Sequence, residues 1–440
     1  MRLKLERDNY GKLILIGTSV VMWLLIMFSF RAIGYEETWH LWKIPTWKVA
    51  FMDFRLIPGS AESFANGFEP TVKNPYDPTH RIFNYPFFWR LFFYTGISLE
   101  DTIWISVSMI ILFFISVFLF PEKLTIAGAV GMLLVLFSPA SMLLYERGNV
   151  DLIVFFVCAM AVLATSYSAY LATGLILFAA IMKLFPILGL TVLLREPKRK
   201  FLWLSVASVL VLLTYMVVTW RSVRASWDST MRGDGLSYGT EVLVDRYAVS
   251  ITQLFSRWFA PNQVDLLLHY GPLVVAFGIL LFILVLSSLD AKPIRTATER
   301  NLAAFRMGAS IYVGTFLLGN NWDYRLAFLV LIVPQVVEWM RSPQKTFRLA
   351  AWSSLILVLL SCWHLRIVEI PMEAVFRSVE DSRKFWIILD EIFNWMLFAS
   401  LAYLLVASLP DWIEELSKNL LAKLGLLNRR DHEYENPVLR

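Results

Sequence analysis

Apolar runs of nearly twenty residues recur along the whole 440-residue chain, and this feature limits the possible folds most strongly. A helix needs about twenty mostly apolar residues to cross the hydrocarbon core of a bilayer. The repeated runs therefore predict an all-α polytopic membrane protein with about ten to eleven transmembrane helices. Ten candidate spans are residues 13–30, 102–120, 124–145, 152–170, 201–219, 271–289, 303–319, 324–340, 349–368 and 386–408.

The composition agrees with this class. Hydrophobic residues make up 58% of the chain and charged residues 17%, whereas an ordinary soluble domain is about a quarter charged. No polar block is long enough to form a soluble domain, so residues 1–408 are predicted to be one transmembrane domain. Within it, residues 31–101 and 220–270 are expected to be external loops. Residues 409–440 are predicted to be a tail that begins as an amphipathic helix on the cytoplasmic surface.

The basic residues predict the orientation. The net charge of +5 arises mostly from Lys and Arg between apolar runs, which is typical of cytoplasmic connections and not of a nucleic-acid surface. No small-residue cleavage site follows the first run, so we expect a retained span and not a signal peptide. The absence of a glycosylation sequon favours a bacterial inner membrane. The two cysteines lie inside apolar runs, which argues against disulfides and zinc sites.

Residues 171–194 are an exception among the apolar runs. Lys183 and Pro186 lie near the middle, where proline breaks a helix and a charged side chain is costly in lipid. A broken, re-entrant pair of half-helices would place every basic connection on the cytoplasmic side. One straight span with a topology exception elsewhere is the alternative.

Four polar segments then share the external side, namely residues 31–101, 146–151, 220–270 and 319–325. The first contains Asp53 and Arg55, followed by "NPYDP" and by the aromatic run "FNYPFFWRLFFY", which contains Asn84 and Tyr85. We expect this run to form short interfacial helices. A structured loop with a snorkelling arginine is the simpler alternative.

The segments "ERGNVD" and "GNNWDYR" place several polar groups at the ends of apolar runs. Helix capping explains a single acid such as Asp151, but it does not explain the neighbouring Arg147 and Asn149. In the second segment, Asn320 and Asp323 could cap the next helix, whereas Arg325 opposes the helix dipole and favours a nearby anion. Snorkelling is the alternative for Lys183. Other polar residues near predicted span ends are more often structural: His364, Arg366, Asp390 and Glu391.

Taken in order, these motifs resemble the integral-membrane glycosyltransferases of the GT-C superfamily, and within it glycosyltransferase family 87. The resemblance covers residues 50–330 and depends on Asp53 in the first loop, the "NPY" turn with "FNYP", the "RGNVD" turn, the "KLFP" stretch and the late "DYR". Family 87 comprises polyprenol-phosphate-mannose-dependent mannosyltransferases and their bacterial relatives.

The resemblance implies a GT-C-like bundle that transfers a sugar from a polyprenyl-phosphate donor to a glycan or lipid acceptor outside the membrane. It also implies that Asp53 is the general base. The chemistry agrees, because a carboxylate can accept the acceptor's proton and fixed cations stabilise a leaving phosphate. We expect inversion and neither metal nor cofactor. The expected donor-phosphate ligands are Lys183, Arg325 and Arg147, and the expected substrate-binding residues are Arg55, Asn84, Tyr85, Asn149, Asp151, Asn320 and Asp323.

Three alternatives remain at this level. A flippase or other transporter of lipid-linked sugars would also have many spans and a cationic cavity, although the sequence shows no internal repeat. A surface-polysaccharide polymerase or ligase would carry its large external loop later in the chain. A non-catalytic membrane assembly factor would not need Asp53.

Overall fold

The computed structural model describes residues 2–229, 235–289, 298–370, 375 and 379–413. Helices make up most of this part of the chain. Two short strands, β1 (Ser237–Tyr238) and β2 (Asn321–Trp322), pair in an antiparallel manner and join segments far apart in sequence. The predicted all-α class is confirmed.

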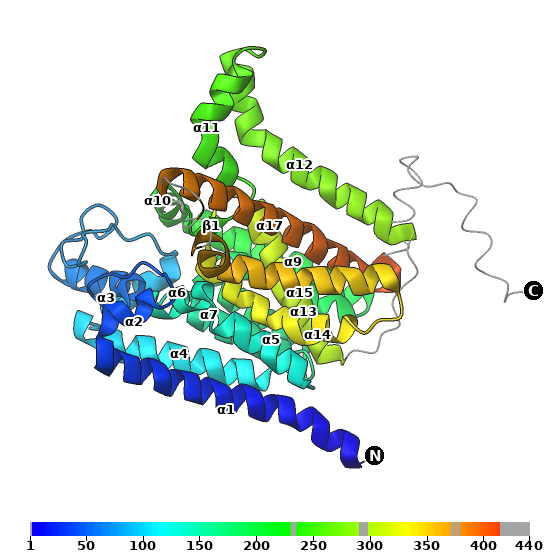
Figure 1. The fold of residues 1–440 in the computed structure, drawn as a ribbon. Helices are drawn as coiled ribbons and strands as arrows, with labels where there is room; N and C mark the ends of the chain where they lie inside the picture. Colours follow the sequence, from blue (N-terminus) through cyan, green and yellow to red (C-terminus); the bar gives the residue numbers. More distant parts are fainter. Residues whose placement is uncertain (1, 230–234, 290–297, 371–374, 376–378, 414–440) are drawn as a thin grey trace, which may run out of the picture.

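Six helices of the described chain contain stretches long and apolar enough to cross a membrane, or seven if one bent pair forms a single span. The bent pair, α5 and α6, turns by 53° at Ser138, which caps α6 ahead of Pro139. Many of these helices lie side by side (Figure 1). The six are α1 (Arg2–Ile33), α4 (Thr102–Leu119), α9 (Lys198–Val218), α12 (Pro261–Leu289), α15 (Lys345–His364) and α17 (Val379–Ala407), and the bent pair is α5 (Ile126–Leu136) and α6 (Pro139–Arg147).

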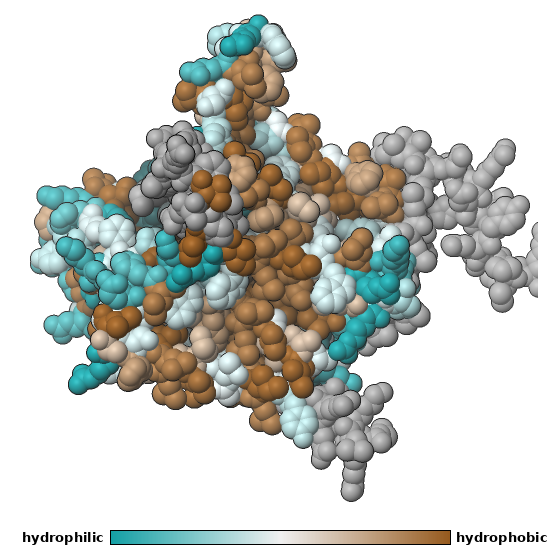
Figure 2. All heavy atoms as spheres, in the orientation of Figure 1, coloured by the Kyte–Doolittle hydropathy of each residue, from teal (hydrophilic) through white to brown (hydrophobic). Residues whose placement is uncertain are grey.

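Apolar and hydrophilic side chains are separated along the direction of these helices. Apolar residues cover the middle of the face drawn in Figure 2, and hydrophilic residues gather towards its two ends. This distribution is the one expected of helices that cross a bilayer. The protein is therefore an integral membrane protein, as predicted.

Three predicted spans are not long apolar helices. Residues 152–170 contain the shorter α7 (Asp151–Ala164), and residues 324–340 contain the 3-10 helix η4 (Asp323–Ile332) and α14 (Val333–Trp339). Residues 303–319 belong to α13 (Glu299–Leu317), which is buried along most of its length and packs against η4 and α17. These elements are largely enclosed by protein, so they need not present a continuous apolar surface to lipid. Six or seven helices of the described chain have the length and hydropathy of a span, and the expected ten to eleven spans stay a prediction.

The run 171–194 is broken at Lys183, as predicted. Its two halves are α8 (Ala169–Met182) and the 3-10 helix η3 (Phe185–Arg195), and Lys183 between them has an extended backbone with φ −158° and ψ 125°. Since α8 packs against both α7 and η3, the chain folds back on itself. It is therefore not one straight helix.

The loop 31–101 contains the expected short helices, and they gather at the end of the bundle opposite the N-terminus (Figure 1). The aromatic run forms the 3-10 helix η1, which packs against α3, and the indole N–H of Trp89 donates to the carbonyl of Met182 at 2.9 Å. This contact ties the loop to the break at Lys183. The short elements are α2 (Tyr35–His40), α3 (Met52–Ala65), η1 (Phe87–Tyr94) and η2 (Leu99–Asp101).

Residues 220–270, expected to be a loop, are largely helical in their described part. They form α10 (Trp220–Ser229), α11 (Val242–Phe255) and the start of α12. Helix α11 and the start of α12 project from the bundle (Figure 1), and α12 also packs against α17. Near the other end of the chain, α15 continues into a π-helical turn, η5 (Leu365–Glu369), and the tail begins with Trp412 against Phe201 of α9. Most of the predicted amphipathic tail, residues 414–440, lies outside the described residues.

Candidate functional site

Asp53 is held in the first turn of α3, against the connection between α6 and α7. The residue before the helix, Phe51, has a left-handed backbone with φ 58°, and its N–H donates to the carbonyl of Glu146 at 3.2 Å. This backbone hydrogen bond joins two of the four predicted polar segments. It brings Asp53 beside the "RGNVD" turn.

The turn depends on Gly148, whose φ of 57° is favourable mainly for glycine. A Cβ atom there would lie 2.9 Å from both the Cβ of Phe51 and the Oγ of Ser106. The close approach of the turn to α3 therefore requires a residue without a side chain. It leaves the next residue, Asn149, facing Asp53.

Asn149 connects the carboxylate of Asp53 to Lys183. Its Oδ1 accepts hydrogen bonds from Lys183 Nζ at 3.1 Å and from the N–H of Asp151 at 3.0 Å. Its Nδ2 donates to Asp53 Oδ2 at 2.7 Å. Because Oδ1 faces two donors and Nδ2 faces an acceptor, the orientation of the amide is set by its surroundings.

The side chain of Asp151 lies between two cations. Its Oδ1 is 2.6 Å from Lys183 Nζ, and its Oδ2 is 3.4 Å from Arg325 Nε. Arg325 also donates to Asn321 Oδ1 through NH1, and its guanidinium lies 5.0 Å from the centre of the Phe185 ring. Asp151 is fully buried, so it needs these counter-charges.

Two tyrosine rings flank Lys183. Its Nζ lies 5.9 Å from the ring centre of Tyr85 and 5.6 Å from that of Tyr324, distances at which an ammonium is attracted by a ring. The hydroxyl of Tyr85 donates to the backbone carbonyl of Asp53 at 3.3 Å. Burial, and next the charge of Asp53, raises the pKa of Tyr85 well above its usual value, so this phenol stays protonated.

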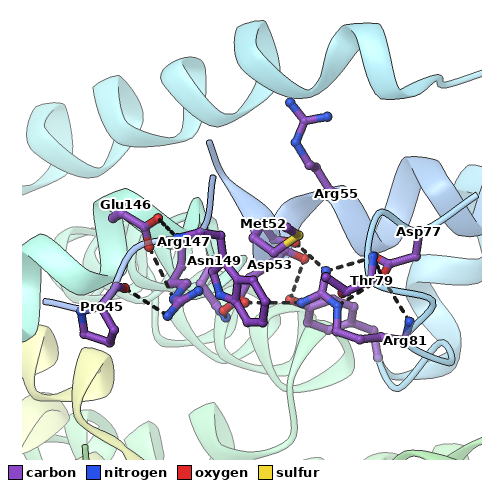
Figure 3. Close-up of polar contacts among 12 residues, drawn as sticks. Pro45, Met52, Asp53, Arg55, Asp77, Thr79, Arg81, Glu146, Arg147 and Asn149 are labelled. Carbon is purple, nitrogen blue, oxygen red and sulfur yellow. Dashed lines mark hydrogen bonds and ion pairs between the residues drawn. The ribbon is translucent and has the colours of Figure 1, made fainter. Parts of the chain in front are cut away.

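Sequence reasoning missed Arg81. Its Nε and NH2 donate to the carboxylate of Asp77 at 3.2 and 2.9 Å, NH2 also donates to the carbonyl of Met52 at 2.6 Å, and NH1 lies 3.6 Å from Asp53 Oδ1 (Figure 3). Burial raises the pKa of Asp77, but the hydrogen bonds and charge of Arg81 outweigh it, and the net shift is downward. The available signal was the spacing of four residues between Asp77 and Arg81 in a proline-rich turn.

The reactive side chains remain partly accessible. Side-chain exposure is 22% for Asp53, 18% for Arg325 and 12% for Lys183, in contrast to 0% for Asp151. Part of each of these three side chains is therefore accessible, whereas Asp151 contacts the two cations from a fully buried position.

Two predicted residues are engaged elsewhere. Arg147 pairs with Glu146 at 3.3 Å, donates to the carbonyl of Pro45 at 3.2 Å and lies 5.5 Å from the ring centre of Trp47. These contacts anchor the segment before α3, and the role of Arg147 as a phosphate ligand stays a prediction. Arg55 donates to the carbonyl of Ala50 at 2.8 Å and points away from Asp53 (Figure 3).

Asp323 belongs to a second polar cluster, and its predicted role as a substrate ligand stays a prediction. Its Oδ2 is 3.6 Å from Nε2 of His364, whose Nδ1 is 3.6 Å from Asp390 Oδ1. All three side chains are buried, as is Glu391. This cluster lies among η4, α15 and α17. Asn84 and Asn320 are half-buried beside Tyr85 and Asn321.

Among the described residues, no three His, Cys, Asp or Glu side chains are placed to hold one metal ion together. The site consists of carboxylate, amide, ammonium, guanidinium and phenol groups. It can accept a proton at Asp53 and bind an anion at Lys183 and Arg325.

The fold and this cluster define the class: an all-α polytopic membrane protein with an ionic site at one end of its helical bundle. Comparisons of the chain with protein-family models, with curated proteins and with solved structures give no match.

Proposed function

We propose that the protein is a membrane glycosyltransferase that moves a mannose-like hexose from a polyprenyl-phosphate donor to an extracytoplasmic glycan or lipid. The observation that carries this proposal is the continuous set of contacts from Asp53 through Asn149 to Lys183, and from Lys183 through Asp151 to Arg325. It joins one accessible carboxylate to two accessible cations. The order of motifs that resembles the GT-C superfamily adds support.

In the proposed reaction, Asp53 accepts the proton of an acceptor hydroxyl as that oxygen bonds to the anomeric carbon. The bond between the anomeric carbon and the phosphate oxygen breaks in the same step, which inverts the configuration. The electron pair leaves with the polyprenyl phosphate. Asp53 is the acidic residue in the first turn of α3.

Lys183 and Arg325 would stabilise the charge that develops on the leaving phosphate. Lys183 has three N–H donors, and in the described part of the chain two of them face Asp151 and Asn149. The third donor and the outer edge of the Arg325 guanidinium are the groups that we assign to the phosphate. Two fixed cations supply the positive charge, so we expect no requirement for a metal.

Basic connections predict that the site lies on the extracytoplasmic side, and we propose the bacterial inner membrane as the location. A donor anchored in the bilayer would bring its sugar phosphate to this end of the bundle. The acceptor would approach from solvent, above Asp53.

The test uses purified protein in nanodiscs with a panel of polyprenyl-phosphate sugars and a membrane extract as the acceptor source. Sugar-dependent release of polyprenyl phosphate, followed by mass spectrometry, measures transfer. Asp53→Asn should abolish release, whereas the matched control Asp265→Asn, at an exposed position on α12, should retain it. Undiminished turnover in Asp53→Asn would remove Asp53 from the mechanism.

Reconstituted vesicles separate the proposal from a flippase. A glycosyltransferase cleaves the donor, whereas a transporter moves the intact lipid-linked sugar to the other leaflet. Translocation without bond cleavage would overturn the proposal.

A further inference from the structure

The contacts of Arg81 divide its guanidinium into two parts. The hydrogens on Nε and NH2 are directed at Asp77 and at the carbonyl of Met52. An arginine fork held at three acceptor atoms has little freedom to move. The remaining nitrogen, NH1, faces Asp53 Oδ1 at 3.6 Å, which is within ion-pair range but longer than a hydrogen bond.

Asp53 is therefore held between two donors on opposite oxygens. Asn149 hydrogen-bonds Oδ2, and the Arg81 NH1 group faces Oδ1. The longer separation at Oδ1 leaves that oxygen able to take a hydroxyl proton. Other ionisable groups whose charges act on or near Asp53 are Glu146, Lys183, Tyr85 and Tyr324.

We infer that Arg81 is a positioning residue for Asp53: locked by Asp77 and Met52, it holds the carboxylate in the orientation that faces the acceptor. Its role in transfer rests on the proposed function, but its effect on Asp53 does not. Arg81 does not itself contact the reacting atoms. Asp77 acts one step further away, by holding the guanidinium in place.

Carbodiimide labelling tests the effect on Asp53 without any donor sugar. Carbodiimides react fastest with carboxyl groups that no cation shields, so the labelling rate of the Asp53 peptide at fixed pH reports how closely Arg81 holds this carboxylate. Arg81→Met should increase the labelling rate at pH 6 at least fivefold, because the facing cation is removed. Arg81→Lys should restore part of the protection, since it keeps the charge but not the three-point attachment.

A second carboxyl group controls for loop opening. Glu62 lies on the same helix as Asp53, and its Oε1 accepts a hydrogen bond from the N–H of Leu99. Its labelling should not change in Arg81→Met. Equal increases at Glu62 and Asp53, or no increase at Asp53, would overturn the inference.

Where a donor and acceptor have been found, kinetics supply a second readout. Arg81→Met should lower kcat at least tenfold and leave KM for the lipid donor within twofold, because the donor phosphate is held by Lys183 and Arg325. Partial rescue of kcat by Arg81→Lys is expected. If labelling responds while no sugar is ever transferred, the proposed function fails but the positioning of Asp53 by Arg81 stands. Should Arg81→Met not fold, Asp77→Asn, which releases the guanidinium, must show the same selective labelling of Asp53.

Discussion

Asn149 donates its side-chain amide to Asp53 Oδ2 at 2.7 Å, across 96 positions of sequence. The same amide accepts from Lys183, so one neutral residue lies between the proposed base and the proposed phosphate-binding cation. The expectation that Asn149 orients sugar hydroxyls stays a prediction, and the structure adds these contacts within the protein. Its Nδ2 and Oδ1 atoms hold Asp53 and Lys183, the two groups that the proposed reaction would use together.

Replacing this amide with a carboxylate should disrupt the site. In Asn149→Asp, a carboxylate oxygen would face Asp53 Oδ2 where the amide N–H now donates, and a second negative charge would lie beside Asp53. The repulsion should displace Asp53, and displacing a reacting group by about 1 Å can cost roughly a hundredfold in rate. We expect initial transfer rates to fall at least that far. Asn66→Asp, at an exposed position where the amide contacts only the carbonyl of Glu62 among the described residues, is the matched control and should retain activity. Equal rates for Asn149→Asp and wild type would show that this amide is not part of the site.

Removing the ammonium of Lys183 should weaken donor binding. A hydrogen bond to a charged group contributes about 1.5–3 kcal/mol, so Lys183→Ala should raise the Kd for a polyprenyl-phosphate sugar roughly tenfold to a hundredfold. Binding of a fluorescent donor to protein in nanodiscs measures this change. Lys73→Ala, in an exposed part of the first loop, should leave Kd unaltered. An unaltered Kd in Lys183→Ala would instead indicate that Lys183 only neutralises the charge of Asp151.

Asp77 should make the stability of the first loop depend on pH. Its pKa in the folded protein lies below the usual value of 3.8, so its stabilising contribution is complete above that value and is lost as pH falls through the lower, folded-state pKa. Asp77→Asn leaves Arg81 without its counter-charge and should cost about 1–3 kcal/mol at neutral pH. Thermal unfolding in detergent should show a lower Tm for the variant at pH 7, and the difference should narrow below pH 3.8. A difference that does not change with pH would contradict this assignment.

The orientation can be tested by cysteine labelling in whole cells. Val72 in the first loop is 77% exposed, and Thr346 is exposed at the start of α15, about 30 Å along that helix from His364. An impermeant maleimide should label Val72→Cys in intact cells and Thr346→Cys only after permeabilisation. The native cysteines, Cys158 and Cys362, are buried and should give little background. The reverse pattern would place the site on the cytoplasmic side.

Some expectations depended on local properties and agree with the structure. A run of apolar residues is hydrophobic whatever surrounds it, which is why the membrane class and several long helices followed directly. The break at Lys183 also followed, since the lysine and Pro186 disfavour a continuous apolar helix at that point. The number of long apolar helices in the described chain did not follow, because α7 and α13 are enclosed by protein and their burial comes from neighbouring elements.

Within the site, residue type alone identified Asp53, Asn149, Lys183 and Arg325 as polar groups that needed partners in an apolar chain. It did not identify which partners they take. Arg147 faces Glu146, Asp323 faces His364, and Arg81 faces Asp53, although only the first of these pairs is adjacent in sequence. The sequence by itself determined that ionised groups would be concentrated at the ends of membrane helices. The tertiary structure alone decided which charges neutralise one another, because electrostatic attraction depends on distances in space that folding sets.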